Sequence, residues 1–290
     1  MQRMVWFVLF TISFLGAILA RGDETRMDKE LQSQIDEIAD RASGVLGCAI
    51  VDLTSGEQWA VEGDTIFPQA SAIKATILME TIRQAHAGEL NLDEIVKITK
   101  QNHVSGSGIL VELGDGTVQM SVRDLCVLMI ALSDNTATNL LIDRIGMDRV
   151  NAMLRDAGAT QTALRRRMMD LAARKRGIEN ISTPYEAAQL MQRLHEGKFV
   201  SREVSNDVLS ILRKPKEGDI QPALPQGVPM ASKTGELPGI LTEWAIVELP
   251  GRPYVLVIMG KDGDSKQFSK AFQDVSAAAY RHFSRLSIKN

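Results

Sequence analysis

The feature that most constrains this chain is the placement of its strand-forming segments, which lie near both ends and leave a long helical middle. Between residues 71 and 197, almost every segment repeats its apolar residues at helical spacing. Runs typical of strands precede and follow this stretch, with turn residues between them. The predicted strands cover residues 48–53 and 57–61 before it, and 228–233, 242–249 and 254–260 after it.

Helices are expected to cover the sheet that these strands form. Apolar residues at helical spacing mark residues 28–42, and residues 265–286 read as a long closing helix. Strands from the two ends must then share one antiparallel sheet, with an all-helical domain inserted between them. The predicted fold class is therefore α/β, of the α+β type. The helices predicted for the insertion include 73–87, 122–132, 136–145 and 184–195.

This division of the chain sets the expected domains. Residues 21–64 and 210–290 are predicted to build the sheet domain, and residues 65–209 the all-α domain. A cleft between two such domains is a common place for a functional site.

The N-terminus has the features of an export signal. Arg3 is followed by an uncharged, mostly apolar run over residues 4–19, and charged residues begin at Arg21. This run is shorter than the roughly 20 residues that span a bilayer, which favours a cleaved signal peptide over residues 1–20. We expect a secreted or periplasmic protein with no stable membrane association after cleavage. An uncleaved membrane anchor is the alternative.

Charge and composition argue against nucleic acid as a partner, since the net charge is −3 and 24% of the residues are charged. One local exception is a basic cluster, interpreted here as a solvated or ion-paired face rather than a phosphate-binding patch. The cluster consists of Arg165, Arg166, Arg167, Arg174, Lys175 and Arg176.

The sequence contains no motif for a metal or an organic cofactor. Its four histidines are scattered, and neither zinc-ligand spacing, a P-loop nor a dinucleotide fingerprint occurs. We therefore expect neither a metal nor a cofactor. Cys48 and Cys126 are the only cysteines. They could form a disulfide with each other or remain as two buried free thiols, and the sequence is compatible with either state.

Three short motifs carry the chemistry, and their order is more informative than any one of them. A Ser-x-x-Lys pattern is expected about once by chance in a chain of this length. The tripeptides Ser-Asp-Asn and Lys-Thr-Gly are each expected by chance fewer than roughly 0.1 times. Both tripeptides downstream in this order should arise by accident less than about once in a hundred chains. The motifs are Ser71-Ala72-Ile73-Lys74, Ser133-Asp134-Asn135 and Lys233-Thr234-Gly235.

Ser71 is the predicted nucleophile. It lies in the first turn of a predicted helix, where free N–H groups and the helix dipole favour a developing oxyanion. Lys74 projects from the same helix face and can approach the Ser71 hydroxyl, which needs such a partner to react at neutral pH. Taken alone, a helix-capping serine with an exposed lysine is the simpler interpretation. The other two motifs favour the catalytic one.

Ser133 and its neighbours connect two predicted helices. In the functional interpretation Ser133 relays a proton to the leaving nitrogen, Asp134 fixes the turn, and Asn135 donates a hydrogen bond to a substrate amide. A simple helix N-cap is the alternative for this tripeptide.

The third motif is predicted to end the strand that begins at residue 228. There the Lys233 cation lowers the pKa of Lys74 and attracts a substrate carboxylate, which Thr234 also binds. Gly235 is expected to let the substrate lie against the strand. The N–H of Glu236 is the candidate second oxyanion donor beside that of Ser71. A strand end running into a turn is the alternative.

With these motifs, the chain resembles the class A β-lactamase and penicillin-binding family of active-site-serine hydrolases over nearly all of its length after the export signal. The resemblance implies an α/β domain and an all-α domain with the serine between them. It also implies acylation of Ser71 by a β-lactam.

The chain departs from the family pattern in three places. The loop 164–184 lacks the glutamate motif that activates the deacylating water, and Asp170 is the nearest candidate base, with Arg166 and Asn180 bracing the loop. Thr242 and Glu243 stand where many relatives carry an arginine for the substrate carboxylate. Cys126 matches one half of a disulfide found in some relatives, but Leu78 occupies its partner's position, so that bridge is absent.

We therefore expect a monomeric serine β-lactamase that gives β-lactam resistance or catabolism and acts on a small-molecule substrate. A penicillin-binding acyl enzyme or D-Ala-D-Ala peptidase with slow deacylation is the same-site alternative. A β-lactam-binding module without enzymatic activity is the alternative from a different functional class.

Overall fold

The computed structural model describes residues 27–114 and 116–288. The predicted signal peptide, residues 1–20, lies outside the described residues. Within the described part of the chain, no helix is both long and apolar enough to cross a membrane.

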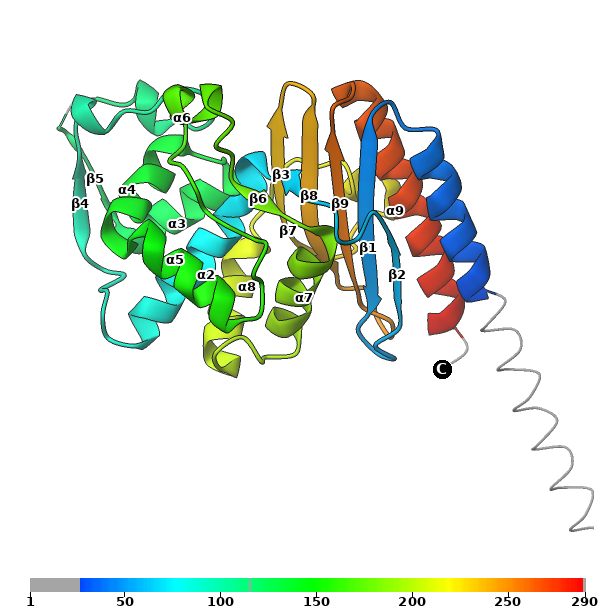
Figure 1. The fold of residues 1–290 in the computed structure, drawn as a ribbon. Coiled ribbons are helices and arrows are strands. Elements are labelled where there is room, and N and C mark those ends of the chain that lie inside the picture. The colour runs from blue at the N-terminus through cyan, green and yellow to red at the C-terminus, as the bar shows by residue number, and fades with distance from the viewer. Residues whose placement is uncertain (1–26, 115, 289–290) are drawn as a thin grey trace, which may run out of the picture.

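Strands from both ends of the chain form one five-stranded antiparallel sheet, as predicted (Figure 1). Its order is β2-β1-β9-β8-β7, so the first and last strands of the chain, β1 and β9, are neighbours within it. The strands are β1 (Val45–Asp52), β2 (Gln58–Val61), β7 (Met230–Leu237), β8 (Ile240–Val247) and β9 (Tyr254–Lys261).

The two faces of this sheet belong to two different cores. Successive residues of a strand point to opposite faces, and in β9 the side chains of Val255 and Val257 pack in the core shared with the helical part. Those of Leu256 and Ile258 pack against the N-terminal helix, residues 27–40, and α9 (Ser265–Ser287). Figure 1 shows these two helices side by side on the outer face of the sheet. Such strands, buried on both faces, read as continuous apolar runs.

The middle of the chain is mainly helical. Side-chain caps begin several of its helices: Ser121 for α3, Asp134 for α4, Thr183 for α7 and Ser201 for α8. The helices are α2 (Lys74–His86), α3 (Val122–Ala131), α4 (Asn135–Ile145), α5 (Met147–Asp156), α6 (Leu171–Lys175), α7 (Pro184–His195) and α8 (Arg202–Leu212).

The mainly helical insertion also holds two small antiparallel sheets that sequence analysis did not predict. They pair β3 (Phe67–Pro68) with β6 (Ile181–Ser182), and β4 (Ile95–Ile98) with β5 (Val118–Ser121). These strands are too short for sequence periodicity to distinguish them from loops. The β3–β6 pair ties the loop 164–184 to the segment just before Ser71.

Candidate active site

Ser71 lies in a 3₁₀ turn, Ala70–Ile73, that leads directly into α2. The preceding residue, Ala70, has a φ of +45°, in the left-handed region that non-glycine residues rarely adopt. Among the described residues, no hydrogen bond engages the Ser71 hydroxyl or its backbone N–H. Ser71 is partly exposed, whereas Ala72 and Ile73 are buried. The strained turn therefore presents one hydroxyl at the surface of a packed helix start.

Gln69 holds this turn in place, and sequence analysis missed it. Its fully buried amide accepts a hydrogen bond from Trp244 Nε1 at 2.9 Å and donates to the carbonyl of Phe67 at 2.9 Å. Its backbone carbonyl accepts from Thr242 Oγ1 at 2.9 Å. A backbone conformation of this kind persists only where its surroundings fix it. No local pattern signals Gln69, since its partners on β8 are remote in sequence.

Lys74 is fully buried and points at the second motif. Its Nζ lies 2.6 Å from the carbonyl oxygen of Ser133, 3.1 Å from Ser133 Oγ and 2.9 Å from Asn135 Oδ1. Burial lowers the pKa of Lys74 well below its ordinary value, and the nearby charge of Lys233 lowers it further. Asp134 opposes this shift of the pKa. The effect of Lys233 on the Lys74 pKa has the direction that the sequence analysis expects.

The Ser133-Asp134-Asn135 turn is fixed chiefly by Asp134. Its carboxylate caps α4 through the N–H of Ala137 at 2.8 Å and accepts from the N–H groups of Ile109 and Leu110 at 2.8 and 2.9 Å. Ser133 has a φ of +52° and Asn135 donates to the carbonyl of Ser105 at 2.9 Å. The N-cap interpretation is therefore confirmed at Asp134, and the turn places the side chains of Ser133 and Asn135 within hydrogen-bond distance of Lys74.

The prediction that the strand ends at Lys233 is wrong. Strand β7 continues through the motif to Leu237, because residues 233–237 pair with residues 240–244 of β8. Lys233 is 1% exposed, and its Nζ donates to the carbonyl of Thr234 at 2.7 Å. Burial and the charge of Lys216 lower the pKa of Lys233 to about 7, against the opposing effect of Glu243.

Gly235 has a packing role that sequence analysis did not predict. A Cβ at this position would lie 2.5 Å from the carbonyl oxygen of Gln69 and 2.7 Å from the backbone nitrogen of Ser71. The glycine is needed because β7 packs directly against the turn that carries Ser71. This contact also brings Gly235 close to the backbone N–H of Ser71.

The loop 164–184 is braced as predicted. Arg166 is buried and pairs with Glu179 through its Nε at 2.9 Å and a terminal nitrogen at 2.7 Å. The side-chain oxygen of buried Asn180 accepts from the N–H groups of Arg165 and Arg166 at 2.7 and 3.0 Å. Asp170 lies at the centre of this loop, where its carboxylate caps α6 through the N–H of Ala173 at 2.9 Å.

Met169, which the sequence analysis did not select, lies beside the site. It has a φ of +59°, and its side chain is 38% exposed. The position that a Cβ on Gly106 would take is 3.4 Å from Met169 Sδ and 2.8 Å from Asn135 Nδ2. A thioether therefore lies near the amide that is predicted to bind substrate. An exposed methionine in a braced loop is a signal that only the structure provides.

Glu243, which is buried, and Lys216, which is partly exposed, lie close enough to Lys233 for their charges to affect its pKa. Glu243 lies opposite Thr234 on β8 and accepts from the N–H groups of Asp219 and Ile220 at 2.8 and 3.0 Å. Burial raises the pKa of Glu243 to about 7 and lowers the pKa of Lys216 to about 8. Lys216 was missed, because its loop position carries no pattern.

Other predictions concern the cysteines and the basic cluster. Cys48 and Cys126 are both buried and free, so the disulfide alternative is excluded. In the cluster, Arg166 and Arg174 contact Glu179, and Arg167 contacts Asp143, as expected of an ion-paired face. No group of three or more potential metal ligands occurs within residues 27–114 and 116–288.

Comparison with known proteins identifies the class to which this fold and site belong. The model of the β-lactamase enzyme family matches residues 30–283, so the chain belongs to that family, whose members include the class A serine β-lactamases. A β-lactamase from Sphaerobacter thermophilus is 30% identical, with a TM-score of 0.81 over 88% of this chain and 97% of its own.

Two further solved structures are similar over most of their length. An ancestral class A β-lactamase is 28% identical, with a TM-score of 0.80 over 87% of this chain and 100% of its own. A mutant of a protein called PBP-A, solved as an acyl-enzyme complex with penicillin G, is also 28% identical. Its TM-score is 0.81 over 89% of this chain and 97% of its own.

Proposed function

We propose that Ser71 opens the ring of a β-lactam, forms a covalent acyl-enzyme and is then released by water, giving β-lactam resistance or catabolism. The observation that carries this proposal is the contact of buried Lys74 with Ser133 and Asn135, which brings two of the three motifs together. The apolar N-terminal segment supports export of the protein to the periplasm or the medium.

Acylation begins with proton transfer from Ser71. Lys74 is suited to accept this proton, because burial and Lys233 lower its pKa and favour its neutral amine. The Ser71 oxygen attacks the lactam carbonyl, and the N–H groups of Ser71 and Glu236 stabilise the oxyanion that forms. Ser133, in contact with Lys74, passes the proton to the ring nitrogen as the C–N bond breaks. The product is an ester on Ser71 and an open ring.

Substrate binding uses the remaining motif residues. Thr234 and the Lys233 cation bind the substrate carboxylate, and Asn135 donates to the amide of the acyl side chain. Gly235 contributes by keeping β7 close to the Ser71 turn. No metal or organic cofactor takes part in this scheme.

Release of the acyl group is assigned to water activated by Asp170. The support is that Asp170 is a carboxylate held by a loop that β6 and Asn180 anchor next to the Ser71 turn. Its role as a helix cap competes with this task, since one oxygen already accepts the N–H of Ala173. We expect deacylation to be the slower step for this reason.

A second candidate is a penicillin-binding acyl enzyme or D-Ala-D-Ala peptidase at the same site. Met169 favours it, because an apolar side chain near Asn135 keeps water from the ester. The similarity to PBP-A, a mutant of which forms an acyl-enzyme with penicillin G, is a further reason to test it.

One experiment separates the two candidates. The purified protein is mixed with a chromogenic cephalosporin while turnover and adduct mass are followed together. Sustained turnover that is lost in Ser71→Ala supports the β-lactamase. One stoichiometric burst with a stable adduct supports the penicillin-binding enzyme. If neither turnover nor adduct is seen, the proposed role of Ser71 is wrong.

A further inference from the structure

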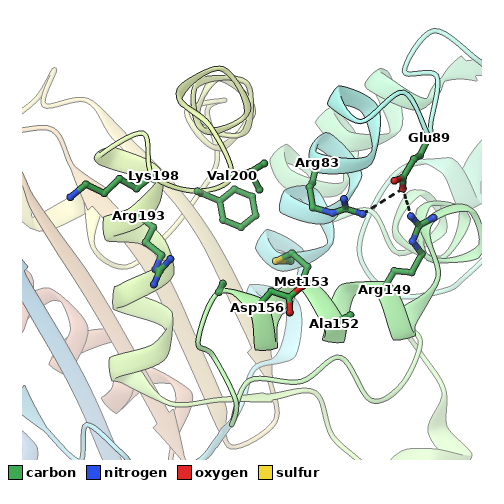
Figure 2. A pocket seen from close by; sticks show the side chains of 11 residues that line it. Arg83, Glu89, Arg149, Ala152, Met153, Asp156, Arg193, Lys198 and Val200 are labelled. Carbon is green, nitrogen blue, oxygen red and sulfur yellow. Dashed lines mark hydrogen bonds and ion pairs between the residues drawn. The ribbon is translucent and has the colours of Figure 1, made fainter.

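A hollow separate from the Ser71 site lies in the helical part. It has a volume of about 440 Å³ and lies between the C-terminal end of α2, helix α5 and the connection from α7 to α8 (Figure 2). Arg83 on its wall follows Lys74 by nine residues along α2, about 13 Å along the helix axis. The hollow therefore does not share the catalytic groups described above, and its volume is in the range of small-molecule sites.

The floor of this hollow is apolar. Met153 and Phe199 are buried there, and Ala152 and Val200 extend the apolar surface towards the rim. Val200 is 63% exposed and has a φ of +59°, a conformation that is strained for a β-branched residue. The Phe199 and Lys198 N–H groups both bond to the carbonyl of Arg193 and hold this connection in place. Strain of this kind is concentrated at functional sites.

Most of the rim charges are already neutralised. Glu89 contacts both Arg83 and Arg149, as the dashed lines of Figure 2 show. Arg83 also binds the buried carboxylate of Glu80, at 2.6 and 2.9 Å. Lys198 pairs with Glu196 at 2.7 Å.

Two further charged residues of opposite sign, Arg193 and Asp156, line the hollow and do not belong to these ion pairs. Within residues 27–114 and 116–288, neither Arg193 nor Asp156 forms an ion pair or a side-chain hydrogen bond. Arg193 projects from α7 on one wall, and Asp156 ends α5 across the hollow (Figure 2). An apolar floor between one such cation and one such carboxylate is complementary to a small zwitterion with an apolar body.

We infer that this hollow is a binding site for a zwitterionic dipeptide with apolar side chains. The guanidinium of Arg193 takes the ligand's carboxylate, and Asp156 takes its ammonium group. The ligand's side chains pack on Met153, Phe199 and Val200. Because both charged contacts are open to solvent, the expected Kd is weak, about 1 mM.

The test is titration of the ¹⁵N-labelled protein with leucyl-leucine, followed by amide chemical shifts. Saturable shifts at Ala157, Phe199 and Val200 are expected. N-acetylation of the dipeptide or amidation of its carboxyl should each weaken binding about five-fold or more. The absence of saturable shifts up to about 10 mM, or equal binding of the N-acetylated form, overturns the inference.

Variants assign the contacts to named residues. Arg193→Gln, at an exposed position, should weaken binding of the free dipeptide about five-fold. It should not change the affinity for the dipeptide whose carboxyl group is amidated, because that ligand has no carboxylate for Arg193 to bind. Arg155→Gln, an exposed arginine on α5 outside the hollow, is the matched control and should change nothing. Unchanged dipeptide affinity in Arg193→Gln contradicts the inference.

Val200→Gly tests the apolar floor without damaging the fold. Glycine adopts the left-handed conformation freely, so this variant should fold at least as readily as the parent in urea titrations. It should nevertheless bind the dipeptide about three-fold more weakly, because an apolar contact is lost. Unchanged affinity in this variant contradicts the proposed role of Val200.

Discussion

The Nζ atom of Lys74 lies 3.1 Å from Ser133 Oγ and 2.6 Å from the carbonyl oxygen of the same residue. These two residues come from different segments of the chain, and the Lys74 side chain in this contact is fully buried. The contact determines both the proton path of the proposed reaction and its dependence on pH.

The first prediction concerns that pH dependence. Acylation needs neutral Lys74, so its rate should rise with pH as Lys74 loses its proton. Because the Lys233 charge lowers the pKa of Lys74, Lys233→Met should raise this pKa and move the acidic limb of the profile to higher pH by about one pH unit. The midpoint of the acidic limb is measured from stopped-flow acylation rates at saturating cephalosporin over a range of pH values. Lys198→Met, remote from the site, is the control, and a limb that stays in place or moves to lower pH contradicts the prediction.

The second prediction concerns the close packing of β7 on the Ser71 turn. Gly235→Ala places a methyl group 2.5 to 2.7 Å from three backbone atoms of that turn, so strand and turn must separate. We expect a loss of about 1–3 kcal/mol in unfolding free energy and at least about 100-fold in acylation rate. Glu236→Ala keeps the backbone N–H, and its rate should stay within a few-fold of the parent. Parent-like acylation in Gly235→Ala would show that the close approach does not position Ser71.

The third prediction separates the two functions of Asp170. Asparagine caps a helix as well as aspartate does, so Asp170→Asn should preserve α6 and the unfolding free energy. If Asp170 activates water, deacylation of the Ser71 ester should fall about 100-fold or more, while acylation is unchanged. Time-resolved adduct mass measures both steps. Deacylation at the parental rate excludes Asp170 as the base.

A companion variant tests Met169. Met169→Glu introduces a carboxylate beside Asn135 and removes an apolar cover, so deacylation should become at least about ten-fold faster. Met169→Gln has similar size and polarity but no basic oxygen, and should give a smaller change. Equal acceleration in the two variants would assign the effect to water access alone.

The fourth prediction uses the buried carboxyl of Glu243. Its pKa is about 7 in the folded protein and ordinarily 4.5, so the folded state binds this proton more tightly than the unfolded chain does. Its contribution to stability is therefore present below pH 4.5 and is lost as pH rises through 7, an effect on the order of 3 kcal/mol. Glu243→Gln should match the parent near pH 4.5 and exceed its unfolding free energy at about pH 8.5, in urea titrations. If the parent and Glu243→Gln have equal unfolding free energies at both pH values, ionisation of Glu243 does not destabilise the folded protein.

Much of the fold could be predicted from the sequence, because long periodic segments specify their own secondary structure. The helices at 122–132 and 184–195 and the strand at 254–260 were each predicted to within one residue at either end. The β3–β6 and β4–β5 pairs were not predicted, since two to four residues give no period. The extension of β7 past Lys233 was missed because the sequence Lys-Thr-Gly-Glu resembles a turn, and only its pairing with β8 makes it a strand.

The sequence by itself selected the candidate catalytic residues, because the types and order of the three motifs allow few other meanings. It also determined that strands from both parts of the chain share one sheet. Only the tertiary structure decided the surroundings of those residues. Burial and the approach of Lys233 lower the pKa of Lys74, Gln69 and Trp244 hold the strained turn, and Asp170 is committed to a helix cap. The physical reason is that pKa values, backbone strain and competing hydrogen bonds depend on neighbours that are distant in the chain.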